Sequence, residues 1–339
     1  MRNHNPLLVV AKRCALLIPQ LIGISIVTFL FLHLLPGNPA YLIAGNLATP
    51  EAVRSIEHHL GLDKPLMVQY VIYVGNILHG DLGTSWLSGN AVLTDLLQRV
   101  PATIELVSIA LIIIAVLGVV LGVVVAVNPR GLIARAVFGY GLLAGALPDF
   151  WIGLILIFIL YYKLRLFPAP LGQLDLGVAT PRTITGMYLV DSLLTANWPA
   201  FGSSLRHLIL PEMTLVFVYM GLVVRMTATS MQGALKADYI RTARASGLGP
   251  LRVDWQALRN ALPPVLTVLG ISYAYLLGGA VLVETIFAWG GIGQYAVQAV
   301  TNSDYLAIEG FVLTAAVFTM IVYLIVDIAH FLLDPRVSV

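Results

Sequence analysis

Charge is scarce in this sequence. Asp, Glu, Lys and Arg make up 11% of its 339 residues, against about 25% in a typical soluble domain. A soluble chain of this length needs a charged surface, so that class is excluded. Disorder is excluded as well, because disordered chains are poor in apolar residues and 59% of this chain is apolar. The composition therefore predicts an integral membrane protein.

Cysteine and catalytic motifs are scarce too. The single cysteine, Cys14, excludes an internal disulfide framework and a multi-cysteine metal site. The phosphate-cradling pattern G-x-x-x-x-G-K-[ST], the zinc pattern H-E-x-x-H and the nucleophile pattern G-x-S-x-G do not occur. We predict no catalytic residue, no metal ligand and no cofactor on this chain. The net charge of +2 is too balanced to indicate a nucleic-acid partner. Transport or channel activity is the class that remains.

Long apolar runs are what the sequence does have. A membrane-crossing helix needs roughly 20 mainly apolar residues. Six runs qualify, which predicts an all-α membrane protein with six transmembrane helices: Cys14–Leu35, Leu106–Val127, Ala136–Tyr162, Leu208–Val224, Leu262–Val283 and Gly310–Val326. The pairs Gly118/Gly122 and Gly141/Gly145 have the small-xxx-small spacing that lets helices approach closely.

An even number of spans places both termini on one side of the membrane. With the N-terminus cytoplasmic, the inside segments hold 12 Lys and Arg residues and the outside segments 7, which together are the 19 in the chain. The positive-inside rule therefore favours cytoplasmic termini. The expected organisation has four parts: 1–35, the N-terminus and first span; 36–101, a helical extracytoplasmic segment; 102–330, the core with an inside loop at 225–260; and 331–339, a cytoplasmic tail.

Acidic residues within the spans mark candidate pathway positions, because a mid-membrane charge costs roughly 2.5–3.5 kcal/mol on insertion scales. Asp149 falls within the third span, and Glu212 lies beside Pro211 in the fourth. The remaining acids of the spans lie at span ends, where we expect interfacial solvation: Glu105, Glu284, Glu309 and Asp327. The spans carry no relay of acids with basic partners, which argues against a proton-driven carrier.

The inside loop has the pattern of a short helix, a glycine turn and a second helix. Asp238 to Ala245 is rich in helix formers, Gly247 and Gly249-Pro250 end it, and the second helix leads to Pro263-Pro264. Two interpretations of the arginines in this loop stay open. They reflect the positive-inside rule alone, or they belong to a docking surface.

Residues 238–248 and 257–264 resemble the coupling-loop motif of ABC-importer permeases, with the closest likeness to the B-type subunit of dipeptide and oligopeptide importers. The segments 60–65, 80–85, 185–191, 207–211 and 284–293 agree with this family in the same order. The resemblance covers nearly the whole chain. Departures fall at Gly290, where proline is common, and at Asp149 and Glu212, where uncharged residues are more frequent.

The resemblance implies a type I ABC importer permease fold in the cell inner membrane. It implies that this chain forms half of a heterodimeric pore with a C-type permease subunit. Two ATP-binding subunits would bind ATP and Mg²⁺, and an extracytoplasmic binding protein would deliver the peptide. Nickel, glutathione or oligosaccharide uptake on the same scaffold stays an alternative. Outside the family, the alternatives are an ion-coupled carrier and a structural scaffold.

The resemblance also assigns the site residues. The ATPase-coupling loop is expected to consist of Asp238, Tyr239, Arg241, Thr242, Ala243, Arg244, Ala245 and Gly247. Tyr239 and Ala243 lie four residues apart on one helix face, so we expect both to fill a groove on the ATPase. An extracytoplasmic gate or a contact with the binding protein is expected at Asp81, Glu284 and Trp289. Independently of the resemblance, the pathway is expected at Asp149 and Glu212, because they are acids within the spans.

Overall fold

The computed structural model describes residues 6–34, 49–60 and 63–333. Within these residues the secondary structure is helical apart from one isolated β-bridge between Thr84 and Ala91. The chain forms two compact units, one of residues 1–100 with 294–321 and the other of residues 101–293 with 322–339. The all-α prediction is confirmed for the described part of the chain.

The elements, in chain order, are α1 (Pro6–Leu34), α3 (Pro50–Leu60), α4 (Leu66–Leu78), α5 (Val92–Val127), α6 (Leu132–Ala146), α7 (Asp149–Leu156), the π-helical turn η1 (Ile157–Lys163), α8 (Tyr188–Leu194), α9 (Trp198–Leu235), α10 (Asp238–Ala245), α11 (Pro250–Ile286), α12 (Ile292–Thr301) and α13 (Tyr305–Leu333). Among them, α5, α9, α11 and α13 are long and apolar enough to cross a membrane.

The six-span prediction is only partly matched. The pair α6 and α7–η1 makes a fifth candidate only if a 108° bend is counted as one broken span. The predicted first span coincides with α1, whose described apolar stretch Ala15–Leu30 is shorter than a full span, and Leu35 lies outside the described residues. The structure therefore gives four spans, or five with the bent pair.

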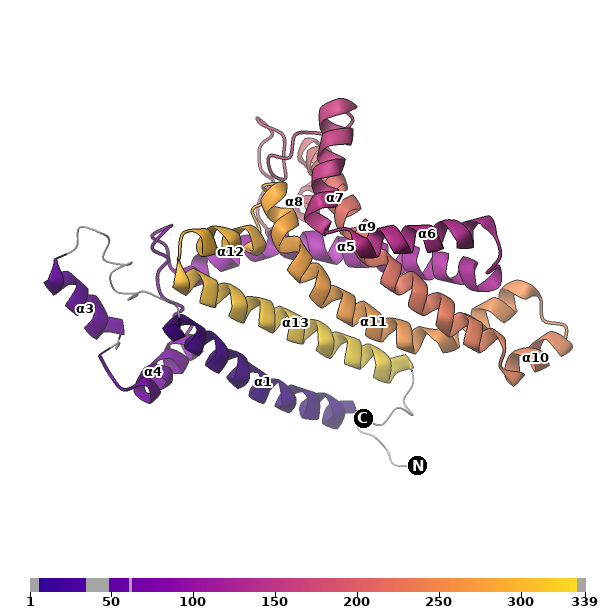
Figure 1. Cartoon of the computed structure of the whole chain (residues 1–339), viewed down its shortest axis with the longest axis horizontal. Coiled ribbons are helices and arrows are strands. Elements are labelled where there is room, and N and C mark those ends of the chain that lie inside the picture. Colours follow the sequence, from indigo (N-terminus) through magenta and orange to yellow (C-terminus); the bar gives the residue numbers. More distant parts are fainter. Residues whose placement is uncertain (1–5, 35–48, 61–62, 334–339) are drawn as a thin grey trace. The chain divides into compact units, whose positions relative to one another are not determined.

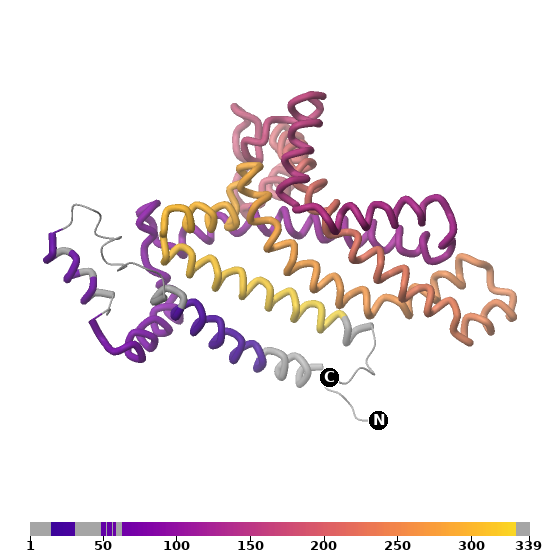
Figure 2. Tube along the Cα trace, in the orientation of Figure 1, coloured from indigo at the N-terminus to yellow at the C-terminus, as the bar shows by residue number. Residues whose placement is uncertain are grey.

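The predicted third span, Ala136–Tyr162, is not one continuous helix, because the chain bends at Leu147-Pro148 between α6 and α7. Figure 2 shows the sharp change of direction of the tube at this point. Proline has no backbone N–H and disfavours the helical conformation of the residue before it. Leu147 accordingly has an extended backbone, with φ −109° and ψ 135°. Asp149 therefore begins a new helix instead of lying in the middle of one.

Helices α9 and α11 are the long elements of the second unit, and they run side by side with α10 at the turn between them (Figure 1). Asn197 caps α9 by accepting a hydrogen bond from the Ala200 N–H at 3.2 Å. Pro250 occupies the first turn of α11, where its missing N–H costs nothing. Both helices continue through internal prolines, so α11 passes Pro263-Pro264 and ends at Ile286.

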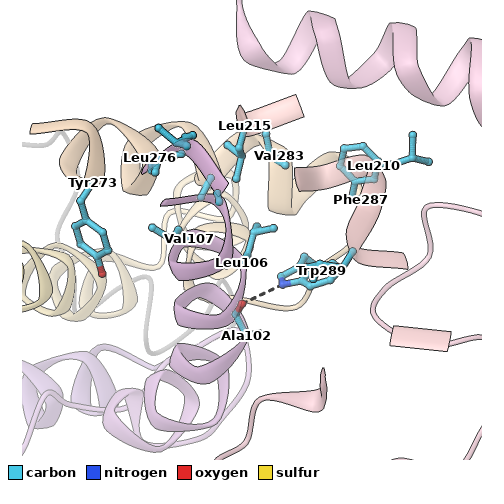
Figure 3. Close-up of a cluster of buried hydrophobic side chains, with 14 of the residues drawn as sticks. Ala102, Leu106, Val107, Leu210, Leu215, Tyr273, Leu276, Val283, Phe287 and Trp289 are labelled. Carbon is cyan, nitrogen blue, oxygen red and sulfur yellow. Dashed lines mark hydrogen bonds between the residues drawn. The ribbon is translucent and has the colours of Figure 1, made fainter. Parts of the chain in front are cut away.

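The core of the second unit collects buried side chains from α5, α9, α11 and the segment after α11. Figure 3 shows Leu106, Leu215, Leu276 and Trp289 among them. Gly118 and Gly122 of α5 lie directly against α9, where a β-carbon would collide with Val223 and Thr227 respectively. The predicted close approach is confirmed for this pair. Around Gly141 and Gly145 a β-carbon would meet no atom of the described chain within 4 Å.

The first unit is held by polar contacts as well as by apolar packing. Ser25 of α1 lies 2.9 Å from the Tyr70 hydroxyl of α4, and the ring of Phe29 packs edge-on against Tyr70. Ser85 donates a 2.5 Å hydrogen bond to Asp304, which lies 219 residues further along the chain. Helices α3 and α4 match the helical character predicted for the segment 36–101 within its described residues.

Candidate functional site

Helix α10 is anchored to its own chain by one face. Ile240 is fully buried and Ala243 is 7% exposed. Both pack in a small apolar cluster with residues of α5, α9 and α11, among them Met231 and Ala257. Burial of such side chains stabilises the position of the helix by about 25 cal/mol per Å² of apolar surface. The short helix is thus fixed on the ends of α9 and α11.

Gly247 ends α10 in a Schellman motif. The Gly247 N–H donates to the Arg244 carbonyl at 3.0 Å, and the Leu248 N–H donates to the Ala243 carbonyl at 3.2 Å. Gly247 has φ +79°, a conformation that costs other residues roughly 1–2 kcal/mol. Leu248 then packs against the same apolar cluster as Ala243. The predicted glycine turn is confirmed, and its reason is the left-handed backbone.

The opposite face of α10 is open. Asp238, Tyr239, Arg241, Thr242, Arg244 and Ala245 are exposed, and the Tyr239 side chain is 42% exposed. Arg241 lies 3.4 Å from Asp238, but both groups are so exposed that this ion pair contributes little to stability. The expectation that Tyr239 and Ala243 share an outward face is wrong, because Ala243 points into the cluster beside Ile240.

Two exposed apolar residues of α11 were not identified from the sequence as candidate site residues. Leu251 is 85% exposed and Trp255 is 64% exposed. They lie four residues apart, so they are neighbours on the helix surface. The signal available in the sequence was this i, i+4 pair of large apolar side chains in the same stretch as Arg252 and Arg259. Together with Tyr239 they give the turn region an exposed surface that is partly aromatic and partly cationic.

Asp149 lies where three helices meet. Its Oδ1 accepts a 2.8 Å hydrogen bond from the Phe150 N–H, and its Oδ2 accepts a 3.0 Å bond from the Tyr219 hydroxyl of α9. Gly279 of α11 completes the contact, since a β-carbon there would lie 2.5 Å from Oδ2 and collide with the Tyr219 hydroxyl. The carboxylate is half-buried, so it sits at the break between α6 and α7 and is partly accessible.

Glu212 is buried within α9, where it is 5% exposed. Neither of its carboxyl oxygens has a hydrogen-bond partner among the described residues. Glu105 of α5 is 2% exposed, and its Oε1 accepts bonds from the N–H groups of Leu189 (2.9 Å) and Val190 (3.2 Å) of α8. The expected interfacial solvation is therefore wrong for Glu105, and likewise for Glu309, which is 6% exposed.

Glu284 and Trp289 are interior residues. Glu284 is fully buried and accepts a 2.5 Å hydrogen bond from Thr103 of α5. The Trp289 indole N–H donates to the Ala102 carbonyl at 3.0 Å, as Figure 3 shows. The expectation of interfacial solvation for Glu284 is therefore wrong. Both side chains are covered by residues of their own chain, and their expected role at an extracytoplasmic gate or in a contact with the binding protein stays a prediction.

Asp81 is exposed and accepts a 2.9 Å bond from the Gly83 N–H in the turn-rich loop after α4. It belongs to the first unit, whereas Glu284 and Trp289 belong to the second. Among the described residues, no group of three or more His, Cys, Asp and Glu side chains could hold a metal ion. The arrangement suits partner docking and solute passage better than bond-making chemistry.

The segment between η1 and α9 is fastened by two carboxylates. Asp191 accepts bonds from the N–H groups of Ile184, Thr185 and Gly186, at 2.8–3.0 Å. Burial alone would raise the pKa of Asp191, but these bonds and one from the Thr185 hydroxyl hold it below its usual value. Asp175 lies 3.1 Å from His207 of α9, and that hydrogen bond lowers the pKa of Asp175.

Comparison with known proteins identifies similar chains over nearly the whole length. The family model described as the binding-protein-dependent transport system inner membrane component matches residues 118–339, and that of the N-terminal part of such membrane components matches residues 7–107. The probable D,D-dipeptide transport system permease protein of Escherichia coli strain K12 is 42% identical over 331 residues, 97% of each chain. The di/tripeptide transport system permease protein of Pseudomonas aeruginosa strain UCBPP-PA14 is 40% identical, over 97% of this chain and 98% of its own.

Proposed function

Because the chain belongs to the family of binding-protein-dependent transport system inner membrane components, we propose that it is the permease subunit through which an ATP-driven importer moves di- and oligopeptides. Relatives at 42% and 40% identity carry dipeptide or di/tripeptide transport in their names. The chain is a multi-pass inner membrane protein, in keeping with its family and its long apolar helices.

A complete importer would contain this chain, a second permease subunit of the C type, two ATP-binding subunits and an extracytoplasmic binding protein. ATP and Mg²⁺ would bind to the ATP-binding subunits. The sequence of this chain supports that division of labour, because it contains no phosphate-cradling motif of its own.

Helix α10 is the docking element for an ATP-binding subunit in this proposal. The observation that carries it is the two-faced burial of α10. Ile240 is buried in its own chain while Tyr239, beside it in sequence, is 42% exposed. A helix fixed on one side can transmit a push from the other. Leu251 and Trp255, which are 85% and 64% exposed, extend the same docking surface onto α11.

Movement of α10 would reach the membrane core through α9. Glu212 lies 23 residues before Leu235, where α9 ends next to α10. At about 1.5 Å of rise per residue, that stretch of helix spans roughly 35 Å. Closure of the ATP-binding subunits would thus tilt a single rigid lever between the docking face and the buried acid. Rigid-body rocking of this kind interconverts the inward-open and outward-open states.

The pathway is proposed to pass Asp149 and Glu212, and the extracytoplasmic gate to involve Asp81, Glu284 and Trp289. The half-buried carboxylate of Asp149 at the helix break supports its place in the pathway. Glu284 and Trp289 are buried against α5, which supports a role in closing the gate and not a role in docking the binding protein. Cytoplasmic termini are supported by the 12 to 7 distribution of basic residues.

Two neighbouring glycines give the test of docking. Gly247 has φ +79° and Gly249 has φ −63°, and a β-carbon at either would meet no described atom within 4 Å. Gly247→Ala should introduce roughly 1–2 kcal/mol of backbone strain at the end of α10 and so distort it. Gly249→Ala should introduce no such strain, because Gly249 has a negative φ. We expect the first variant to lose co-purifying ATP-binding subunit and transport, and the second to keep both. Equal behaviour of the two would remove the docking assignment.

Substrate class is tested separately with the assembled importer in proteoliposomes. A binding protein that delivers solute to this importer is loaded with one candidate solute, and ATP-dependent uptake is measured. We expect accumulation of di- or tripeptides. Uptake of nickel, glutathione or an oligosaccharide, without uptake of peptide, would overturn the assignment of a peptide substrate. Uptake without ATP would overturn the ATP-driven mechanism in favour of an ion-coupled carrier.

A further inference from the structure

Two buried carboxyl groups in the second unit have more acceptor oxygens than the described chain satisfies. Glu105 and Glu212 are only 2% and 5% exposed. Three of their four oxygens have no hydrogen-bond partner among the described residues, namely Glu105 Oε2 and both oxygens of Glu212. Glu105 accepts its hydrogen bonds from α8, and α8 packs against α9, the helix that carries Glu212, so the two carboxyl groups lie within electrostatic range of each other. Neither group forms an ion pair with a Lys, Arg or His among the described residues.

Such a pair is costly unless something compensates it. An unpaired polar group in an apolar interior costs roughly 2–7 kcal/mol, and an isolated charge costs more. The neighbouring Asp191 does not relieve the pair, because its own oxygens already accept four bonds from residues 184–186. The donors to Glu105 are N–H groups of α8, at Leu189 and Val190, and both point to Oε1. Glu105 is thus held by donors on one oxygen only, and the other three buried oxygens of the pair have no donor among the described residues.

We infer that Glu105 and Glu212 form a binding site for the primary ammonium group of the transported solute. An ammonium group has three N–H donors, and the pair has three open acceptor oxygens. One positive charge between two carboxyl groups also offsets part of the cost of burying them side by side. Among the described residues, fewer than three carboxylate or imidazole side chains gather there, so the site suits an ammonium group better than a metal ion.

The inference rests on the proposed function for the identity of the solute, but the site itself can be tested without transport. The probe is methylammonium, with tetramethylammonium as a cation of equal charge that has no N–H donor. The reporter is modification of Glu212 by the small neutral reagent diisopropylcarbodiimide, which attacks protonated carboxyl groups. The assembled importer is treated in lipid nanodiscs, and modification at Glu212 is measured by mass spectrometry.

We expect methylammonium at ten times its Kd to lower the modification of Glu212 about tenfold by simple occupancy. Tetramethylammonium should lower it much less. Glu309 is the control in the same sample, because it is also buried, on α13, and has one oxygen without a partner among the described residues. Its modification should not change. The site would be overturned if both cations protected Glu212 equally, or if methylammonium protected Glu309 as well as Glu212. It would also be overturned if Glu212 were not protected, or were not modified at all.

Two variants test the pairing and the solute. Glu105→Gln removes one carboxyl charge and keeps the size of the side chain. The methylammonium concentration that halves the modification of Glu212 should therefore rise at least about tenfold, as expected for the loss of one charge-assisted hydrogen bond. An unchanged requirement would exclude Glu105 from the site. Glu212→Gln should slow uptake of a peptide with a free amino terminus about tenfold from the loaded binding protein.

The outcomes for the site and for the proposed function are distinguishable. Unchanged uptake by Glu212→Gln, together with protection by methylammonium, would mean that the site takes some other amine and would overturn the assignment to the solute. Failure of the wild-type importer to take up any peptide would overturn the proposed function and not the site.

Discussion

The Tyr219 hydroxyl donates a hydrogen bond to Asp149 Oδ2 at 3.0 Å. The bond joins α9 to the first residue of α7, directly after the 108° bend that divides the predicted third span. Gly279 of α11 leaves room for both partners. The geometry of the break thus depends on three helices, and two of the predictions below alter it from different sides.

A methyl group at position 279 should break the Asp149–Tyr219 bond. Gly279→Ala places a β-carbon 2.5 Å from Asp149 Oδ2, so the carboxylate or the phenol must move. We expect a loss of stability of about 1–3 kcal/mol, as for overpacking of a well-packed site. Gly278→Ala is the matched control, since a β-carbon there meets no described atom within 4 Å. Thermal unfolding in detergent measures both, and equal melting temperatures would contradict the prediction.

Removing only the charge of Asp149 should affect transport more than stability. The Asp149→Asn variant keeps a side-chain oxygen that can accept the Tyr219 bond. We therefore expect little change in melting temperature and about tenfold slower uptake of cationic peptides, in line with the roughly 1.5–3 kcal/mol of a charge-assisted bond. Uptake assays with peptides of different charge measure this effect. An unchanged rate and an unchanged substrate range would reject a pathway role for Asp149.

Replacing Gly122 should separate α5 from α9. A β-carbon at this position would collide with Thr227 and lie 2.9 Å from the Val224 carbonyl. We expect Gly122→Ala to cost about 1–3 kcal/mol, because backbone atoms cannot move aside as a flexible side chain can. Gly145→Ala on α6 is the control and should be close to neutral, since that position contacts no described atom within 4 Å. Comparable losses in both variants would contradict the proposed close crossing.

Acid should release the tether between Asp175 and α9. Hydrogen bonds from His207 and Ser203 hold the pKa of Asp175 below its ordinary value of 3.8. A carboxyl group whose pKa is lower in the folded state stabilises the fold above the unfolded pKa, and this contribution is lost as pH falls through the folded pKa. We expect Asp175→Asn to lower the melting temperature slightly at neutral pH and not at all well below pH 3.8.

The measurement for this tether is thermal unfolding of the wild type and Asp175→Asn between about pH 2 and 7. Ser203→Ala should show a smaller difference of the same sign, because it removes one of the two side-chain donors. A difference between wild type and Asp175→Asn that stays constant over the whole pH range would show that the tether does not depend on the charge of Asp175.

Local signals predicted α10 well. The helix formers at 238–245 and the glycine at 247 correspond to the observed helix and its left-handed end. They did so because a helix and its cap are decided by residues a few positions apart. The face of Ala243 was not decided locally. It depends on Met231, Val253 and Ala257, which surround it in the folded chain.

The bend at Leu147-Pro148 and the burial of acidic residues such as Glu284 could not be predicted from the sequence, for a different reason. Proline occurs inside α5, α9 and α11 without dividing them. A proline alone therefore does not say whether a helix breaks, because neighbouring helices can satisfy the freed backbone group. Glu284 was expected at an interface because it follows an apolar run. Its donor, Thr103, lies 181 residues away, and no local pattern indicates that contact.

By itself, the sequence determined that this protein resides in a membrane, that it is helical, and that the loop at 225–260 is charged and carries the motif of its family. Those properties come from composition and from short-range spacing, which the bilayer and the helix impose on each segment separately. Only the tertiary structure decided which face of α10 is open, where the third span breaks, and which carboxyl groups are left with open oxygens. These depend on which distant side chains meet, and pairing between distant residues is a property of the folded chain.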